Sequence, residues 1–251
     1  MFIHFTVPPI ASATVKVMLV LSFASLVRSS FGFGEALFAV PLLALMMPVK
    51  EAAPLAVLAS ITVAAIVLVQ DWSDVNVRSA SHLVLSSIVG IPLGLLFLTK
   101  IPEPIVKAGL GGLILGFSIF SLTSTRPYEL KNDGKAWIFG FSAGVLGGAY
   151  GMNGPPLVIY GALRGWSPRE FRATLQGYFF PASLIIMFGF WISGLWTRAI
   201  TRYYLVCLPA LIIAVLVGRV INRRMHPSRF LRYVYVALTL IGLVLMAQAV
   251  R

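Results

Sequence analysis

The residues best suited to chemistry lie in the stretch Gly147–Leu157, which reads Gly-Gly-Ala-Tyr-Gly-Met-Asn-Gly-Pro-Pro-Leu. This stretch interrupts a long apolar run, and its glycines and prolines cannot continue a membrane helix. A proline pair is tolerated in the first turn of a new helix. The free N–H groups of Met152, Asn153 and Gly154 would then lie at the positive end of that helix, which is an anion-binding site. The alternative interpretation is a packing kink in which glycines allow close helix contact.

A second interruption lies near the N-terminus, where the chain reads Ser-Ser-Phe-Gly-Phe-Gly-Glu over residues 29–35. It contains Gly32 and Gly34, and an apolar run follows it. Superposing Gly32 on Gly151 gives an offset of 119 residues, the difference between 151 and 32. Irregular backbone survives in a membrane only inside protein or beside a polar cavity, so paired interruptions indicate an internal duplication and a transporter's binding site. The same offset superposes Lys50 on Arg169, Glu51 on Glu170 and Trp72 on Trp191.

Charged and amide side chains within the apolar segments are further candidates. Glu35 lies where an ionised carboxylate is costly, so it is either a proton-coupling carboxylate or a structural partner of Arg28. Arg28 could also bind the oxyanion of a substrate, or lie at the membrane interface. Asn153 offers a donor and an acceptor, or simply tolerates left-handed backbone. Tyr150 and Gln176 could line the same cavity. The predicted substrate-binding residues are Arg28, Gly32, Gly34, Tyr150, Gly151, Met152, Asn153, Gly154 and Gln176, with Glu35 as the candidate for proton coupling.

The composition sets the class of protein. The chain has 251 residues, of which 59% are hydrophobic and 11% charged, and its mean hydropathy is +0.92. Soluble domains carry roughly a quarter charged residues, so an all-α polytopic membrane protein is predicted. The net charge of +12 is scattered among short loops, as expected when positive charge stays on the cytoplasmic side, and does not indicate nucleic-acid binding. Cys207 is the single cysteine, which excludes a disulfide framework and a thiol-based metal site.

The apolar segments repeat in the same order in both halves of the chain. Each half runs through a glycine break, a short apolar segment, a charged corner and three longer apolar segments. We therefore divide the chain into a first repeat (1–123), a polar connector (124–135) and a second repeat (136–251), which form one integrated bundle. Gly90 and Gly94 are interpreted as positions of close helix packing. The predicted segments are Ile10–Val27, Glu35–Met47, Ala52–Val69, His82–Leu98 and Ile105–Leu122, then a short segment ending at Tyr150, and Leu157–Leu163, Thr174–Gly194, Tyr203–Ile221 and Phe230–Ala249.

The topology depends on how each broken segment enters the membrane. A segment that crosses once leaves the two halves parallel, whereas one that enters and returns inverts the second half. With the Arg219–Arg232 loop placed inside, Lys and Arg number about 11 inside and 6 outside for the crossing arrangement, and about 12 and 5 for the re-entrant one. The charges do not decide between them. We favour inverted repeats, because inversion brings both glycine breaks to mid-membrane, where they could face one another.

At the two breaks the sequence resembles the sulfite exporter TauE/SafE family of membrane permeases. The resemblance rests on the segments Phe31–Leu43 and Gly147–Leu157, and the duplicated helical pattern around them extends it to nearly the whole chain. It implies an inner-membrane transporter of sulfite, sulfonates or related small organic anions. Glu35 departs from the family pattern, since many members look richer in glycine there, and a carboxylate beside an anion site requires an explanation.

The leading hypothesis is a multi-pass secondary transporter of a small anion in the inner membrane, with proton coupling as one means of driving it. The alternatives are a passive anion channel and, with less support, an intramembrane enzyme. Ser29 and Ser30 have no obvious His or Asp partner inside the membrane, and no His/Glu metal spacing is present, so neither catalysis nor a metal or other cofactor is predicted. The chain lacks a Gly-x4-Gly-Lys-Ser/Thr loop for ATP. The predicted partners are the lipid bilayer and the small anion, not nucleic acid, and self-association into a homo-oligomer is left open.

Overall fold

The computed structural model describes residues 12–123, 130–222 and 228–249, and all regular structure in these ranges is helical. The all-α prediction is therefore confirmed, and part of the predicted connector lies outside the described residues. Short 3-10 turns, η1 (Trp72–Asp74) and η2 (Asp133–Lys135), follow α3 and precede α6. The first half contains α1 (Ser12–Phe31), α2 (Glu35–Ala44), α3 (Val49–Asp71), α4 (Val77–Lys100) and α5 (Glu103–Thr123). The second half contains α6 (Ala136–Tyr150), α7 (Gly154–Leu163), α8 (Pro168–Ile192), α9 (Arg198–Asn222) and α10 (Ser228–Ala249).

The lengths of the helices separate membrane spans from half-helices. Six of the described helices, α1, α3, α4, α5, α8 and α9, are long and apolar enough to cross a membrane. By contrast, α2 and α7 have 10 residues each. Such a helix is about 15 Å long, roughly half the thickness of the hydrocarbon core. The chain is thus a polytopic helical membrane protein with two short helices, as the sequence predicts.

Glycines with left-handed backbone produce both breaks. Gly32 has φ +86° and Gly34 has φ +101°, and Gly151 has φ +65°. Residues with a Cβ rarely adopt these values, which explains why glycine is required here. The amide of Gly32 donates to the carbonyl of Arg28 at 2.6 Å, and that of Gly151 donates to the carbonyl of Gly147 at 2.7 Å. The preceding helix therefore ends in the same way in both halves.

Helices of the first half pack against helices of the second half. Each such contact has a counterpart in which the two halves exchange roles. α1 packs against α9 and α6 packs against α4, while α3 contacts α8 and α5 contacts α10. Glycine brings the α4 and α6 backbones together, since a Cβ on Gly90 would lie 2.2 Å from the carbonyl oxygen of Phe141 and one on Gly94 would lie 2.0 Å from that of Val145. The close packing predicted for these two glycines is confirmed.

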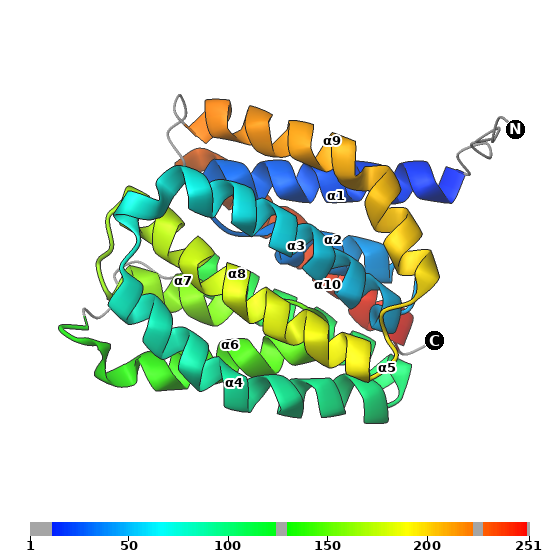
Figure 1. The fold of residues 1–251 in the computed structure, drawn as a ribbon. Coiled ribbons are helices and arrows are strands. Elements are labelled where there is room, and N and C mark those ends of the chain that lie inside the picture. The colour runs from blue at the N-terminus through cyan, green and yellow to red at the C-terminus, as the bar shows by residue number, and fades with distance from the viewer. Residues whose placement is uncertain (1–11, 124–129, 223–227, 250–251) are drawn as a thin grey trace, which may run out of the picture.

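Helices that correspond in the predicted repeat run in opposite directions. In Figure 1, α1 runs from the right of the view to the left, whereas α6 runs from left to right. The pair α3 and α8, which lies in the middle of the bundle, is opposed in the same way. α3 is the most deeply buried of the six spans, with 67% of its most apolar window inside the protein. Which side of the membrane each helix begins on stays a prediction.

Candidate functional site

A buried ion pair lies at the first break. Arg28, in the last turn of α1, is 3% exposed, and its Nη1 lies 2.5 Å from Oε2 of Glu35 in the first turn of α2. Ser25 Oγ donates to Oε1 of the same carboxylate at 3.2 Å. A buried charge is stable only when it is paired and hydrogen-bonded. The pairing of Arg28 with Glu35, one of the alternatives for these residues, is therefore present.

Arg28 has further partners on two distant helices. Its Nη1 donates to Ser60 Oγ of α3 at 2.6 Å, and its Nε and Nη2 donate to Oε1 of Gln176 in α8 at 3.1 and 2.8 Å. Its guanidinium carbon lies 4.5 Å from the ring centroid of Phe179, which is a cation–π distance. These contacts gather α1, α2, α3 and α8 around one cation. They bring together Arg28 and Gln176, both of which the sequence singled out.

Gln176 also closes the first break. Its Nε2 donates to the carbonyl of Gly32 at 2.8 Å and to that of Arg172, one turn earlier in α8, at 3.4 Å. The side-chain oxygen faces the guanidinium of Arg28 and the nitrogen faces carbonyl groups, so every described contact of the amide joins a donor to an acceptor. The amide thereby links the irregular backbone of the first half to a long helix of the second half.

The two glycine breaks meet at a small cavity beside Arg28. Its volume is about 10 Å³, which is the space of about one water molecule. Residues of both breaks line it, so the facing arrangement expected from inverted repeats is present. Asn153 is 4% exposed there, and its side chain makes no capping hydrogen bond to α7. The lining residues are Arg28, Gly34, Glu35, Ala36, Leu37, Ser60, Met152, Asn153, Gly154 and Phe179.

Tyr150 and the N–H group of Met152 do not contribute to the site as the sequence predicted. The ring of Tyr150 packs 6.0 Å from that of Phe97, and its hydroxyl lies 2.4 Å from the position that a Cβ on Gly109 would take. Its side chain thus fills space beside α4 and α5 and does not line the central cavity. The N–H of Met152 donates to the carbonyl of Leu146 at 3.3 Å. It is not the free donor that the sequence suggested, because the left-handed turn folds it back onto the end of α6.

Each break docks on a long helix of the other half. A Cβ on Gly32 would lie 3.0 Å from the Cα of Arg172 in α8. A Cβ on Gly151 would lie 2.8 Å from Cγ2 of Val57 and 3.0 Å from the carbonyl oxygen of Ala53, both in α3. The first break thus meets polar side chains and the second meets apolar ones. The offset of 119 residues that relates the two glycines also relates these partners, Ala53 to Arg172 and Val57 to Gln176.

Sequence reasoning missed Ser60 and Phe179. Both are residue types that are common in membrane helices and carry no motif of their own. Their numbers also differ by 119, so they occupy equivalent positions of α3 and α8. Applying the repeat offset to the helices that pack across the middle of the bundle would have drawn attention to both positions. Their partnership with Arg28 still required the docked helices.

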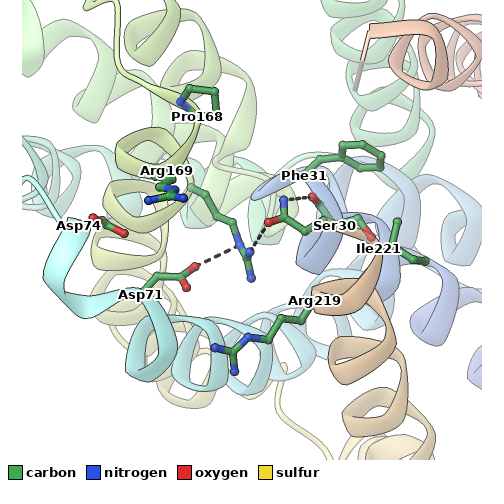
Figure 2. Close-up of a pocket in the computed structure, with 10 residues that line it drawn as sticks. Ser30, Phe31, Asp71, Asp74, Pro168, Arg169, Arg219 and Ile221 are labelled. Carbon is green, nitrogen blue, oxygen red and sulfur yellow. Dashed lines mark hydrogen bonds and ion pairs between the residues drawn. The ribbon is translucent and has the colours of Figure 1, made fainter. Parts of the chain in front are cut away.

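A larger cavity, which we call the vestibule, opens where one end of α3, α8 and α9 meets the end of α1. Its volume is about 530 Å³. Figure 2 shows Asp71, Asp74, Arg169 and Arg219 around it. Sequence reasoning did not single it out, because its residues come from distant segments of the chain. The remaining lining residues are Ser30, Phe31, Pro168, Arg172, Ile221 and Asn222.

Polar contacts lead from the vestibule toward Arg28. Arg172 Nε lies 3.2 Å from Oδ2 of Asp71, and Arg172 Nη1 donates to Oδ1 of Asn222 at 2.8 Å. Asn222 Nδ2 in turn donates to a backbone carbonyl near the end of α1 at 2.5 Å. One turn further along α8 is Gln176, which holds Arg28. Arg172 and Arg28 therefore lie one after the other along a polar route from the vestibule into the protein.

A separate polar cluster ties η2 to α4 and α7. Asp133 Oδ1 accepts hydrogen bonds from Tyr160 Oη at 2.6 Å and from Ser79 Oγ at 2.8 Å, and Arg164 Nε lies 3.2 Å away. Desolvation by itself raises the pKa of Asp133, but the two hydrogen bonds and the charge of Arg164 outweigh it and hold the pKa below its ordinary value. This carboxylate stays ionised at neutral pH and fixes the end of the connector.

Comparisons with known proteins give the family of the chain. The profile of the family described as "Sulfite exporter TauE/SafE" matches residues 17–245. The chain is also similar to the probable sulfite/organosulfonate exporter TauE of Cupriavidus necator, with 28% identity over 182 residues that cover 72% of this chain and 70% of that protein. No solved structure matches the chain. Because the profile extends from α1 to α10, the chain belongs to the sulfite exporter TauE/SafE family.

Proposed function

We propose that this protein is a secondary transporter that exports a small anion, sulfite or an organosulfonate, across the inner membrane of the cell. The observation that carries the proposal is the position of Arg28, a buried guanidinium beside a cavity between two helix breaks. Guanidinium donors match the geometry of oxyanions. Transporters bind substrates at such breaks, where two repeated halves meet. The family and the name of the relative from Cupriavidus necator support the anionic substrate.

Glu35 explains how a buried cation is neutralised when no substrate is present. Its carboxylate pairs with Arg28, and an entering anion carries the same charge and competes for the same donors. Once displaced, the carboxylate lies unpaired in an apolar interior, where its ionised form is costly. It then takes up a proton from water and becomes a neutral carboxyl group. One proton then moves in the same direction as each anion, which couples transport to the proton gradient, and export draws on the outward gradient of the anion.

The vestibule supports loading from the cytoplasm. Arg219, in the last turn of α9, lines it, and α9 leads into the arginine-rich connection that the positive-inside rule assigns to the cytoplasm. An anion then meets Arg172 first and Arg28 second, with Gln176 between them. On the far side, the apolar packing of Gly151 against α3 closes the route. Release outward requires that this packing opens after the vestibule has closed.

A passive anion channel is the second candidate, because the same arginines would also attract conducted ions. The central cavity admits about one water molecule, so passage of an anion requires a rearrangement, which favours alternating access over a permanent pore. An intramembrane enzyme finds no support in the two serines before the first break. Ser29 Oγ donates to the carbonyl of Val215, and Ser30 Oγ donates to the carbonyl of Leu26.

The test is transport by the purified protein in sealed lipid vesicles. Uptake of labelled sulfite and of ethanesulfonate is measured with and without an imposed pH gradient. We expect a saturable rate and accumulation against the anion gradient, whereas a channel only lets the concentrations equalise. Arg28→Gln should abolish transport, while Arg78→Gln, at an exposed position in α4, should retain it. Equal rates for both variants, or no transport of either anion, would contradict the proposal.

A further inference from the structure

A second arginine–carboxylate pair lies where the vestibule meets the interior. The side chain of Arg172 is 9% exposed and that of Asp71, the last residue of α3, is 21% exposed. Arg172 Nε lies 3.2 Å from Oδ2 of Asp71, and both residues line the cavity of about 530 Å³. The pair therefore repeats the chemistry of Arg28 and Glu35 at a place that water and ions reach first.

The predicted repeat indicates that the fold does not require the pair of Arg172 and Asp71. The offset of 119 residues places Ala53 at the position equivalent to Arg172 and Phe190 at the position equivalent to Asp71. Ala53 and Phe190 are both fully buried, with 0% exposure. The same helix arrangement is thus built once with an ion pair and once with apolar packing. Apolar residues commonly replace a buried ion pair without loss of stability, so a structural need does not explain Asp71.

The chemistry of the vestibule explains why Asp71 is present. Arg169 and Arg219 face the same space and raise the local concentration of anions. An anion that reaches Arg172 finds a guanidinium already holding the carboxylate of Asp71. A sulfonate and a carboxylate carry the same charge and accept hydrogen bonds from the same donors. Binding of one at Nε of Arg172 therefore requires displacement of the other.

We propose that the vestibule is a loading site for the transported anion and that Asp71 is a built-in competitor for Arg172. This inference rests on the proposed function and deepens it. Asp71 lowers the affinity of the loading site, so an anion is passed on toward Arg28 instead of being held at the entrance. Asp71 stays in the vestibule when an anion displaces it from Arg172, and the positive charges of Arg169 and Arg219 in the same space offset the charge of its carboxylate.

The experiment compares two carboxylates in the same vestibule. Binding of ethanesulfonate to the purified full chain is measured by titration calorimetry at fixed ionic strength, with sulfite as the second probe. Asp71→Asn should lower the Kd about tenfold, because it removes the competitor, a gain of about 1.4 kcal/mol. Asp74→Asn removes the same charge from an exposed position and should change the Kd by about twofold or less. Asp71→Ser replaces Asp71→Asn if the amide variant does not fold.

A double-mutant cycle separates competition from a general field effect. In an Arg172→Gln background, Asp71→Asn should give no gain in affinity, since the group for which Asp71 competes is absent. Unchanged or weaker binding by Asp71→Asn and Asp71→Ser overturns the inference, as does an equal gain for Asp74→Asn or a gain that survives Arg172→Gln. Those results leave the proposed function standing. If the wild-type protein binds neither probe, the proposed substrate class and the inference both fail.

Discussion

Gln176 and Arg28 form a buried contact that joins the two halves of the protein at the first break. They lie 148 residues apart in sequence, and Oε1 of Gln176 accepts from Nε and Nη2 of Arg28 at 3.1 and 2.8 Å. Nε2 of Gln176 donates to the carbonyl of Gly32 at 2.8 Å. An amide suits this place because it satisfies a guanidinium and a carbonyl without adding charge. One side chain therefore contributes both to the closure of the first break and to the placement of the buried cation.

The first prediction follows from this contact. In Gln176→Leu the guanidinium of Arg28 and the carbonyl of Gly32 each lose a hydrogen-bond partner. This lowers the free energy of unfolding by about 1–3 kcal/mol for each buried group. We expect a lower unfolding temperature and loss of transport. Gln176→Glu should fold better but weaken ethanesulfonate binding about tenfold, because it places a second carboxylate beside Arg28. Gln248→Leu, at an exposed position in α10, is the control. Wild-type binding by both Gln176 variants would refute the assigned role.

The glycine breaks give a second prediction. Gly32→Ala and Gly151→Ala place a Cβ on left-handed backbone, which costs about 1–2 kcal/mol before any clash. Gly151→Ala also drives that atom to 2.8 Å from Val57. Both variants should insert into the membrane but unfold earlier and transport more slowly. Gly112→Ala is the matched control, since a Cβ there meets nothing within 4 Å. If the breaks were only packing kinks, the three variants would have the same unfolding temperature in detergent and the same rate of uptake into vesicles.

The third prediction concerns energy coupling through Glu35. Glu35→Gln keeps the shape and most of the hydrogen bonding of the side chain but cannot release a proton. The variant should still bind the anion, because the competitor for Arg28 has lost its charge. It should fail to accumulate the anion in vesicles under an imposed pH gradient. Normal accumulation by Glu35→Gln would make Glu35 a structural partner of Arg28 and would require another route for the proton.

The membrane orientation of the two halves can be read from cysteine labelling. Lys50 lies in the first turn of α3 and Arg169 in the first turn of α8, the corresponding helix of the second half. Inverted repeats place the two positions on opposite faces. In a Cys207→Ser background, a membrane-impermeant maleimide should label Lys50→Cys from outside intact cells and Arg169→Cys only after the cells are opened. Labelling of both from the same face would restore the parallel arrangement.

The Asp133 cluster predicts a pH-dependent contribution to stability. Asp133→Asn removes the charge facing Arg164 and should cost about 1 kcal/mol at neutral pH. The folded pKa of Asp133 lies below its unfolded value of about 3.9, so the stabilisation is complete above that pH and is lost as pH falls through the folded pKa. The unfolding temperatures of the wild type and the variant should therefore converge in acid. A constant difference down to the lowest pH would mean that the ionised carboxylate contributes nothing.

The sequence by itself determined the features that depend on local chemistry. Apolar length marks the membrane spans, and glycine with proline marks the breaks, because the conformations open to a residue depend on its own side chain and its neighbours. The predicted span His82–Leu98 lies within α4, which begins earlier because the Asn76 side chain accepts from the amide of Ser79 and caps the helix. The pairing of Arg28 with Glu35, seven residues apart, was likewise an alternative within reach of the sequence.

Only the tertiary structure decided what surrounds Arg28. Gln176 was a candidate without an assigned partner, while Ser60 and Phe179 carried no signal, and Tyr150, a neighbour of the second break in sequence, turned out to face α4 and α5. The physical reason is that a helix presents a different side chain every 100° or so, and docking fixes its rotation about its axis. Contacts between residues more than a hundred positions apart arise from that docking, where glycines let backbones approach and a buried cation must find all its partners at once.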